Sequence, residues 1–234
     1  MKIDIHCHSE QHSPDSRIVP KELIQMAEAA GYDAVFLTDP GKVWSSRELA
    51  GLNEMCERLR ILPGIEIALA DGNTLLVLGA DNPVYESLTT PSGVFAQACA
   101  DGYLTVLAHP REPGLPLPPY SALADAVESI TCHHPDAADS AAARAFAVER
   151  KLAELYASDA RGLNYLNRYW IETLEPFDTV QDFRNLIIAR RYGNRMRESN
   201  DVMPPVYKAG TLAELGESDM MALYIQPTVQ SINP

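Results

Sequence analysis

Short apolar runs alternate along the chain with longer runs in which apolar residues recur every three or four positions. The short runs are typical of strands and the longer runs of helices. Strands are predicted at 2–7, 33–38, 61–69, 73–80, 104–109, 125–130 and 155–160, and helices at 20–32, 46–60, 93–103, 141–155 and 180–191. This alternation favours a mainly parallel α/β sheet with helices packed outside it, as a barrel or as a doubly wound sheet.

Residues at the predicted helix ends agree with this pattern. Pro20 suits the first turn of a helix, and Gly31 suits the position just after a helix. Ser45 and Glu48 have the spacing of a capping box. The periodicity fades near Gly193, so we expect one domain over 1–193 and a C-terminal arm or tail over 194–234 that wraps the domain, contacts a partner or stays flexible.

The first predicted strand carries two histidines one residue apart. Alternate residues of a strand share a face, so we expect Asp4, His6 and His8 to point the same way. Imidazoles at positions i and i+2 converge, which suits a metal ion, whereas a single buried histidine is usually a hydrogen-bonded structural residue.

Polar residues also stand where other apolar strands end. The carboxyl ends of parallel strands gather on one face of such a fold, and active sites are built there. A single acidic residue at such a place usually caps the next helix, but a set of them indicates a site. A nitrogen and oxygen ligand set without thiolate favours zinc, manganese or iron. The residues are Asp39, Glu66, His109 and Asp159.

Composition narrows the classes of function. The chain has 234 residues, of which 46% are apolar, and suits one α/β domain. It has no apolar run of about 18 residues and no signal-peptide pattern, so we expect a cytoplasmic protein away from membranes. The four cysteines are scattered and are expected to be reduced. A formal charge of −13 disfavours nucleic acid and leaves a small molecule as the expected substrate.

Four segments in order resemble the PHP (polymerase and histidinol phosphatase) family. They are the opening "DIHCHS…SPDS" with "VPKELIQMAEAAGYDAVFLTD", then "ILPGIEI", "LAHP", and "SDA" with the segment that follows it. The resemblance covers about residues 2–192. It implies a distorted (β/α)7 barrel with up to three divalent metals.

The resemblance assigns one metal to His6, His8, Glu66 and Asp159, all of which are present. A second metal would use Glu66, His109 and a histidine between them, but no histidine occurs over 67–108.

A third metal would use Asp15 and two histidines, whose positions are held by Pro40 and Arg161. We therefore expect a site reduced toward one zinc, manganese or iron ion, with a second, weaker ion between Glu66 and His109 as the alternative. Asp15 remains a candidate ligand.

His109 and Arg161 are the predicted catalytic residues. His109 would complete the metal coordination or act as an acid or base. Arg161 would supply positive charge and paired donors to a phosphate or carboxylate; the alternative is that it faces solvent or pairs with Asp15.

Other polar and aromatic residues give weaker predictions. Asp4 would orient a ligand histidine through its second ring nitrogen. Substitute ligands are sought at His12, Cys132, His133 and His134. Secondary candidates for phosphate binding or pocket walls are Arg184, Arg190, Arg191, Arg195, Arg197, Tyr165, Tyr169 and Trp170.

Three functions remain. The first is a metal-dependent hydrolase, a phosphoesterase that acts on a small phosphorylated molecule. The second is a catalytically silent protein of the same fold that binds a metabolite or a partner. The third, a nuclease or proofreading function, is disfavoured by the net charge and by the absence of attached domains.

Overall fold

The computed structural model describes residues 1–110, 118–133 and 137–197. The strands in this part of the chain are β1 (Lys2–Cys7), β2 (Ala34–Leu37), β3 (Arg60–Ala68), β4 (Thr74–Leu78), β5 (Leu104–Ala108), β6 (Ala126–Ile130), β7 (Ala153–Tyr156), β8 (Tyr169–Thr173) and β9 (Tyr192–Met196). The α-helices are α1 (Pro20–Ala29), α2 (Ser46–Asn53), α3 (Pro91–Asp101), α4 (Ala137–Arg150) and α5 (Val180–Ile188). Short 3₁₀ helices span Pro83–Ser87, Pro119–Leu123 and Leu163–Tyr165.

The described strands form a single sheet in the order β7-β6-β5-β4-β3-β2-β1-β8-β9. β1, β2 and β3 pair in parallel, as do β5, β6 and β7. β4 lies antiparallel between β3 and β5, and β8 lies antiparallel to β1. The expected α/β fold with a mainly parallel sheet is confirmed.

The sheet closes on itself near the carboxyl ends of its parallel strands. There Cys7 of β1 pairs in parallel with Ala160, which follows β7. Nearer the other end, β7 and β9 are joined through a side chain. The Asn194 amide donates to the Glu154 carbonyl at 2.9 Å and accepts from the Tyr156 N–H at 3.1 Å. The result is a distorted barrel.

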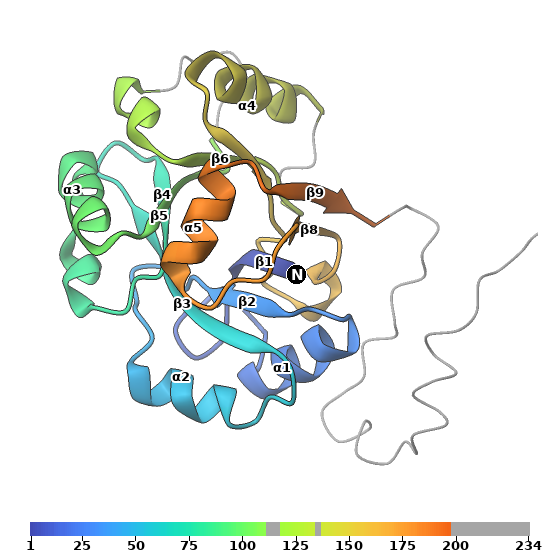
Figure 1. Ribbon diagram of the computed structural model, residues 1–234. Coiled ribbons are helices and arrows are strands. Elements are labelled where there is room, and N and C mark those ends of the chain that lie inside the picture. Colours follow the sequence, from blue (N-terminus) through green and yellow to red (C-terminus); the bar gives the residue numbers. More distant parts are fainter. Residues whose placement is uncertain (111–117, 134–136, 198–234) are drawn as a thin grey trace, which may run out of the picture. The chain divides into compact units, whose positions relative to one another are not determined.

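Helix α5 covers the end of the barrel where the parallel strands begin. Its side chains Phe183 and Ile187 belong to the same buried cluster as Ile3, Leu104 and Ala153, which lie at or near strand starts. Figure 1 shows α5 lying across the strands. Because this end is filled by apolar side chains, a polar site has its place at the opposite end.

The other helices pack on the outside of the sheet. Residues of α1 and α2 form one buried cluster with the outer faces of β1 to β3, and residues of α3 and α4 form another with β3 to β6. The Ser45–Glu48 capping box at the start of α2 is confirmed. Pro20 stands in the first turn of α1, as expected. Gly31, with a φ of 74°, follows that helix.

Several predicted boundaries differ from the structure: the helix expected over 46–60 ends at Asn53, and the strand expected over 155–160 is β7 (Ala153–Tyr156). The helix expected over 141–155 ends at Arg150, because Lys151 adopts a φ of 58° and Leu152 N–H bonds back to the Ala147 carbonyl. This is a glycine-type helix end made by a lysine, so the sequence gives little sign of it. β8 and β9 are antiparallel strands that the alternating pattern did not predict.

Residues 198–234 lie outside the described residues, so the C-terminal arm stays a prediction. In the described part of the chain, no helix combines the length and apolar character needed to cross a membrane.

Candidate metal centre

A bulge in β1 turns the two opening histidines into the barrel. The pairing of β1 with β2 runs from Asp4↔Val35 to Cys7↔Leu37, so three steps on β1 match two on β2. The extra residue reverses the alternation. Ile5 lies in the barrel interior, whereas Cys7 belongs to the outer cluster beneath α1 and α2.

The shift explains why one part of the sequence prediction is wrong. His6 and His8 share the inner face, but Asp4 does not orient an imidazole. Its carboxylate accepts from the backbone N–H groups of His6 (3.3 Å) and Ser158 (3.2 Å). Burial raises the pKa of Asp4 to about 6. Strict alternation was the wrong assumption, because a bulge moves every later side chain to the other face.

Four predicted ligands converge in the buried interior. His8 Nε2 lies 3.0 Å from His6 Nε2 and 3.0 Å from Asp159 Oδ1. Glu66 approaches the same point, with Oε2 3.6 Å from His8 Nε2 and Oε1 3.9 Å from His6 Nε2. These residues come from β1, β3 and the loop after β7, far apart in the sequence.

Two of the site residues have unusual backbone conformations. Asp159 has a φ of 48° and His109, directly after β5, has a φ of 25°. Residues other than glycine rarely adopt positive φ, and where the surrounding structure holds them there they cluster at functional sites. Both turns bring the side chain back over the barrel end.

The electrostatics of the cluster favour a cation. Burial opposes charge on Glu66 and Asp159, yet the neighbouring histidines hold the pKa values of both carboxyls well below their usual range. Burial alone would lower the pKa of His6, but the Glu128 and Asp159 carboxylates raise it. Carboxylates that stay ionised inside a protein need positive charge beside them.

The donor set fits a divalent metal. Two imidazole nitrogens that face each other at 3.0 Å, with two carboxylates around them, are a costly arrangement without a shared cation. Nitrogen and oxygen donors of this kind suit zinc, manganese or iron. In the described residues, His6, His8 and Glu66 form one of two groups whose ligand atoms lie within 4.8 Å of one another.

The second predicted metal position, beside Glu66, has polar residues on one side and an apolar residue on the other. His109 Nε2 lies 3.1 Å from Glu66 Oε1, so these two predicted residues are brought together. Directly across the sheet from Glu66 stands Leu76 of β4, on the inner face and fully buried. A leucine therefore occupies the neighbouring place where a further ligand would face Glu66.

Arg161 stands among three carboxylates. Its Nη1 donates to Asp15, its Nε lies 3.3 Å from Asp159 Oδ1, and its Nη2 lies 3.7 Å from Glu66 Oε2. These carboxylates raise the pKa of Arg161 against the effect of burial. Asp15 is joined to the cluster through this guanidinium; neither Asp15 nor Asp159 belongs to the two groups of ligand atoms within 4.8 Å of one another, but Asp159 also contacts His8 directly.

The loop after β2 carries Asp39 and Pro40. The buried Asp39 carboxylate accepts from Ser9 N–H at 2.7 Å, Ser9 hydroxyl at 3.0 Å and Trp44 Nε1 at 2.7 Å. Its Oδ1 lies 4.0 Å from His8 Nδ1. Pro40 pairs with the backbone of Glu66 in an isolated bridge. This loop therefore braces the site through backbone and carboxylate contacts.

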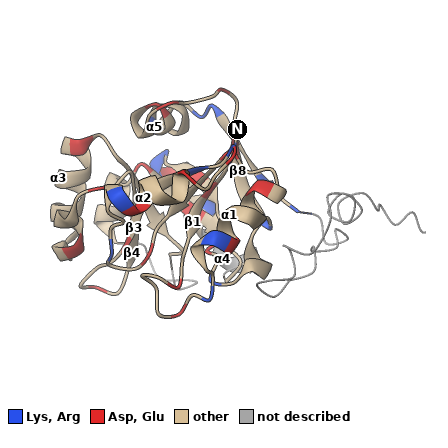
Figure 2. Cartoon of the chain, turned by 90° about the horizontal axis from the view of Figure 1, so that it is seen from below, with Lys and Arg blue, Asp and Glu red and all other residues tan. Residues whose placement is uncertain are grey.

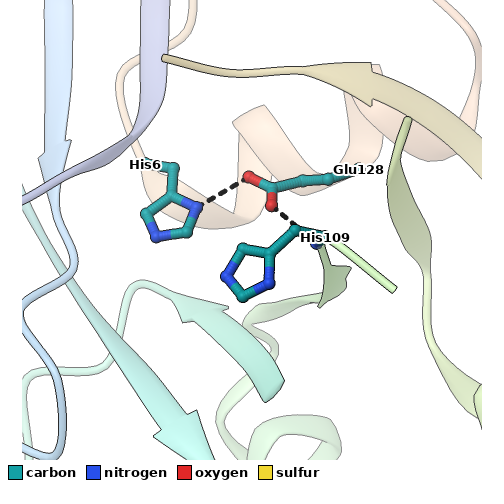
Figure 3. Close-up of side chains that lie close together, drawn as sticks. All are labelled: His6, His109 and Glu128. Atoms are coloured by element: carbon teal, nitrogen blue, oxygen red, sulfur yellow. Dashed lines mark hydrogen bonds and ion pairs between the residues drawn. The ribbon is translucent and has the colours of Figure 1, made fainter. Parts of the chain in front are cut away.

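Glu128 of β6 was missed by the sequence analysis. It is 1% exposed, and its carboxylate accepts from His6 Nδ1 at 2.9 Å and from the His109 N–H at 3.0 Å, as Figure 3 shows. The bond to the second ring nitrogen of His6, expected of Asp4, is therefore made by Glu128. A charged residue inside the apolar strand "AVESI" was the available signal.

The remaining candidates lie outside this cluster. His12 bonds Glu48 at 3.1 Å and packs edge-on against Trp44, and the His133 ring lies tilted against the Tyr165 ring, with centroids 4.7 Å apart. His134 lies outside the described residues. The thiol of Cys132 faces the Tyr165 carbonyl. The ring of Tyr169 lies next to that of Tyr156, and the ring of Trp170 lies beneath the Lys2 ammonium group.

Several arginines near the end of α5 are paired with acids. Arg184 bonds Asp125, Arg191 bonds Glu175, and the Arg195 guanidinium lies 2.9 Å from Glu172. Arg190 bonds the Lys151 carbonyl, and Arg197 donates its backbone N–H to the Arg168 carbonyl. Figure 2 likewise shows basic residues beside acidic ones on α2 and α4.

Comparison with known proteins places the chain. A family model described as PHP domain matches residues 4–161, more than half of the chain. The comparison with curated proteins found no match.

Solved structures share the fold. A two-domain protein from Bacteroides vulgatus, with a predicted PHP-like metal-dependent phosphoesterase, is 19% identical with a TM-score of 0.61; the match covers 84% of this chain and 64% of that one. PsfC from Pseudomonas syringae is 18% identical with a TM-score of 0.63, over 84% of this chain and 91% of that one. An amidohydrolase from Chromobacterium violaceum, with bound sulfate and no metal, is 15% identical with a TM-score of 0.53, over 69% and 88%.

Proposed function

Because the chain belongs to the PHP domain family, we propose that it is a metal-dependent hydrolase, a phosphoesterase that acts on a small phosphorylated molecule. The observation that carries this proposal is the convergence of His6 Nε2, His8 Nε2 and the Asp159 carboxylate, with Glu66 beside them. The phosphoesterase description of the Bacteroides vulgatus protein supports the reaction class.

His6, His8, Glu66 and Asp159 would hold one zinc, manganese or iron ion, with a second, weaker ion between Glu66 and His109 as the alternative. A bound divalent metal lowers the pKa of its water toward about 7 and polarises a phosphoryl oxygen. Glu66 and Asp159 keep their negative charge at neutral pH, because the pKa values of both are held low. The carboxylates can therefore bind a cation without losing a proton, whereas the raised pKa of His6 means that this ligand gives up a proton when a metal binds.

His109 and Arg161 would act on the substrate. His109 Nε2 lies beside Glu66, where it can complete the coordination or transfer a proton to the leaving oxygen. The Arg161 side chain is 23% exposed, so part of the guanidinium is open to solvent while the rest contacts Asp15, Glu66 and Asp159. A guanidinium so placed can bind a phosphate through paired N–H donors.

A second candidate function is a catalytically silent protein that binds a metabolite or a partner. The observation that favours it is the pairing of Arg161 with Asp15 and Asp159, since a phosphate would compete with these carboxylates for the same N–H groups. The family resemblance points the same way, because Pro40 and Arg161 stand where two metal ligands are expected.

A metal and substrate panel separates the two candidates. Metal-free protein is loaded with Mn²⁺, Zn²⁺ or Fe²⁺ and assayed on small phosphomonoesters and phosphodiesters, with bound metal measured in parallel. The variants are His8→Ala and the control His12→Ala, which removes an imidazole bonded to Glu48 instead. Metal-dependent turnover that His8→Ala abolishes and His12→Ala keeps supports the hydrolase. Bound metal without turnover supports the silent protein, and absence of metal binding overturns the proposal.

A further inference from the structure

The carboxylate of Glu128 connects two site residues that the chain separates widely. Its Oε1 faces His6 Nδ1 at 2.9 Å and its Oε2 accepts from the His109 N–H at 3.0 Å (Figure 3). The Glu128 side chain is fully buried, as is that of His6. A buried carboxylate with both oxygens bonded is held in one orientation.

For His6, this contact determines which ring nitrogen points into the cluster. A carboxylate oxygen accepts from a ring N–H, so the hydrogen is assigned to Nδ1, and Nε2 faces His8, 3.0 Å away. A partner on the second nitrogen of a ligand histidine sets its tautomer and ring orientation.

For His109, the contact with Glu128 is made by the backbone N–H group. The residue has a φ of 25°, which a residue other than glycine adopts only when its surroundings hold it there. The bond from its N–H to Glu128 supplies such a restraint at the point where the chain turns out of β5. The turn places Nε2 3.1 Å from Glu66 Oε1.

Glu128 has no room to meet a substrate. The cavity beside it, lined by His109, Ser129 and Thr131 among others, measures about 10 Å³, close to the minimum that one water molecule needs. Its two oxygens already accept from donors. These contacts favour a role in placing other residues over a role in contacting a substrate.

We propose that Glu128 is a positioning residue that sets His6 and His109 together, so that the metal affinity of the site and the place of His109 depend on one carboxylate. This inference rests on the metal-binding part of the proposed function. The carboxylate is specifically required because both partners are N–H donors. An amide oxygen can serve one of them, but its NH₂ group then faces the other donor.

The test compares Glu128→Gln, Glu128→Asp and the control Glu154→Gln in the full chain. Glu154 lies on the neighbouring strand β7 and bonds Ser129 and Arg144, outside the site. Zn²⁺ affinity is measured by competition with a chelator, and the coordination by the absorption spectrum of bound Co²⁺. We expect both Glu128 variants to bind Zn²⁺ about 10- to 100-fold more weakly, with a changed Co²⁺ spectrum, and Glu154→Gln to match the wild type.

The aspartate variant separates position from charge. It keeps the negative charge but is one methylene shorter, so an affinity equal to that of the wild type would show that charge alone matters and would overturn the inference. The group His6, His109 and Glu128 also has ligand atoms within 4.8 Å of one another. Loss of one whole equivalent of metal in Glu128→Gln, with the affinity of another unchanged, would make Glu128 a ligand and would likewise overturn it.

A measurement on the wild-type protein tests the inference even if the Glu128 variants do not fold. Nitrogen NMR of Zn²⁺-loaded protein is expected to show His6 Nε2 bound to metal and Nδ1 protonated. A metal-bound Nδ1 contradicts the inference while leaving the proposed function intact. A wild-type chain that binds none of Zn²⁺, Mn²⁺ and Fe²⁺ removes both.

Discussion

Two sides of the same barrel end carry different kinds of side chain. On the side of β1 and the loop after β7, His6, His8 and Asp159 turn their donor atoms toward one another. On the side of β4 and the loop after β2, Leu76 packs into the apolar core and Pro40 pairs with backbone. The difference supports the proposal of one cation position on the first side.

The guanidinium of Arg161 lies at the border between these sides. It contacts Asp159, which belongs to the converging ligands, and Asp15, which does not. A fixed positive charge there neutralises carboxylates that would otherwise repel each other. In the proposed function, one side would bind a metal and Arg161 would supply a second positive charge.

The largest effect is expected from removing the converging imidazoles. The double variant His6→Ala, His8→Ala should lose all of its metal, because two of the four donors disappear. The wild type should carry about one equivalent, as for a single four-ligand site. Metal content of protein purified without chelator is the measurement, with His12→Ala, His133→Ala as the matched double variant. Metal retained in the first variant would show that the two sides do not differ as described.

The next effect concerns the positive charge at the border. Arg161→Ala should weaken the binding of inorganic phosphate to the metal-loaded protein about 10- to 100-fold, the range for lost hydrogen bonds to a charged group. Calorimetric titration measures it. Arg47→Ala, which removes an exposed guanidinium on α2, is the control. Unchanged phosphate affinity in Arg161→Ala would leave the residue only a structural role.

Much of this comparison follows from sequence. The strand and helix pattern predicts most of the sheet, and the predicted site residues meet at one end of the barrel: Glu66, within β3, contacts His109, and Asp159 contacts His8. The fold class can be predicted because each of these signals is local and repeats along the chain.

The remaining features depend on contacts that the pattern does not contain. The β1 bulge, which turns His6 inward and Asp4 away, is a matter of register with β2. Glu128 has no motif of its own, and its importance appears only when β6 brings it to His6. The three carboxylates around Arg161 come from separate loops and strands. Long-range register and packing decide these features.

A substitution designed to add a metal ligand tests the side of the barrel end that carries Leu76. Leu76→His places an imidazole across from Glu66, and we expect metal content to rise by about one equivalent, since a single histidine would complete a set with Glu66 and His109. Without metal, the buried imidazole should lower the free energy of unfolding by about 1–3 kcal/mol. Metal content and denaturant unfolding measure the two effects.

Leu78→His is the matched control for that gain. Leu78 lies on the same inner face of β4, two residues from Leu76 and opposite Gly64. It should lose stability in the same way without gaining metal. A second equivalent in both variants, or in neither, would show that the place opposite Glu66 is not special.

The smallest effect is expected from the exposed ion pair between Asp15 and Arg161. The Asp15 side chain is 56% exposed, so its ion pair with Arg161 contributes little energy. Asp15→Asn should change phosphate affinity by no more than about fivefold, the upper range for such pairs, and should leave metal content unchanged because Asp15 is joined to the cluster through Arg161. Metal analysis and phosphate titration measure both. Lost metal would restore Asp15 as a ligand, and tighter phosphate binding would mean that Asp15 competes with phosphate for the guanidinium, as the silent protein requires.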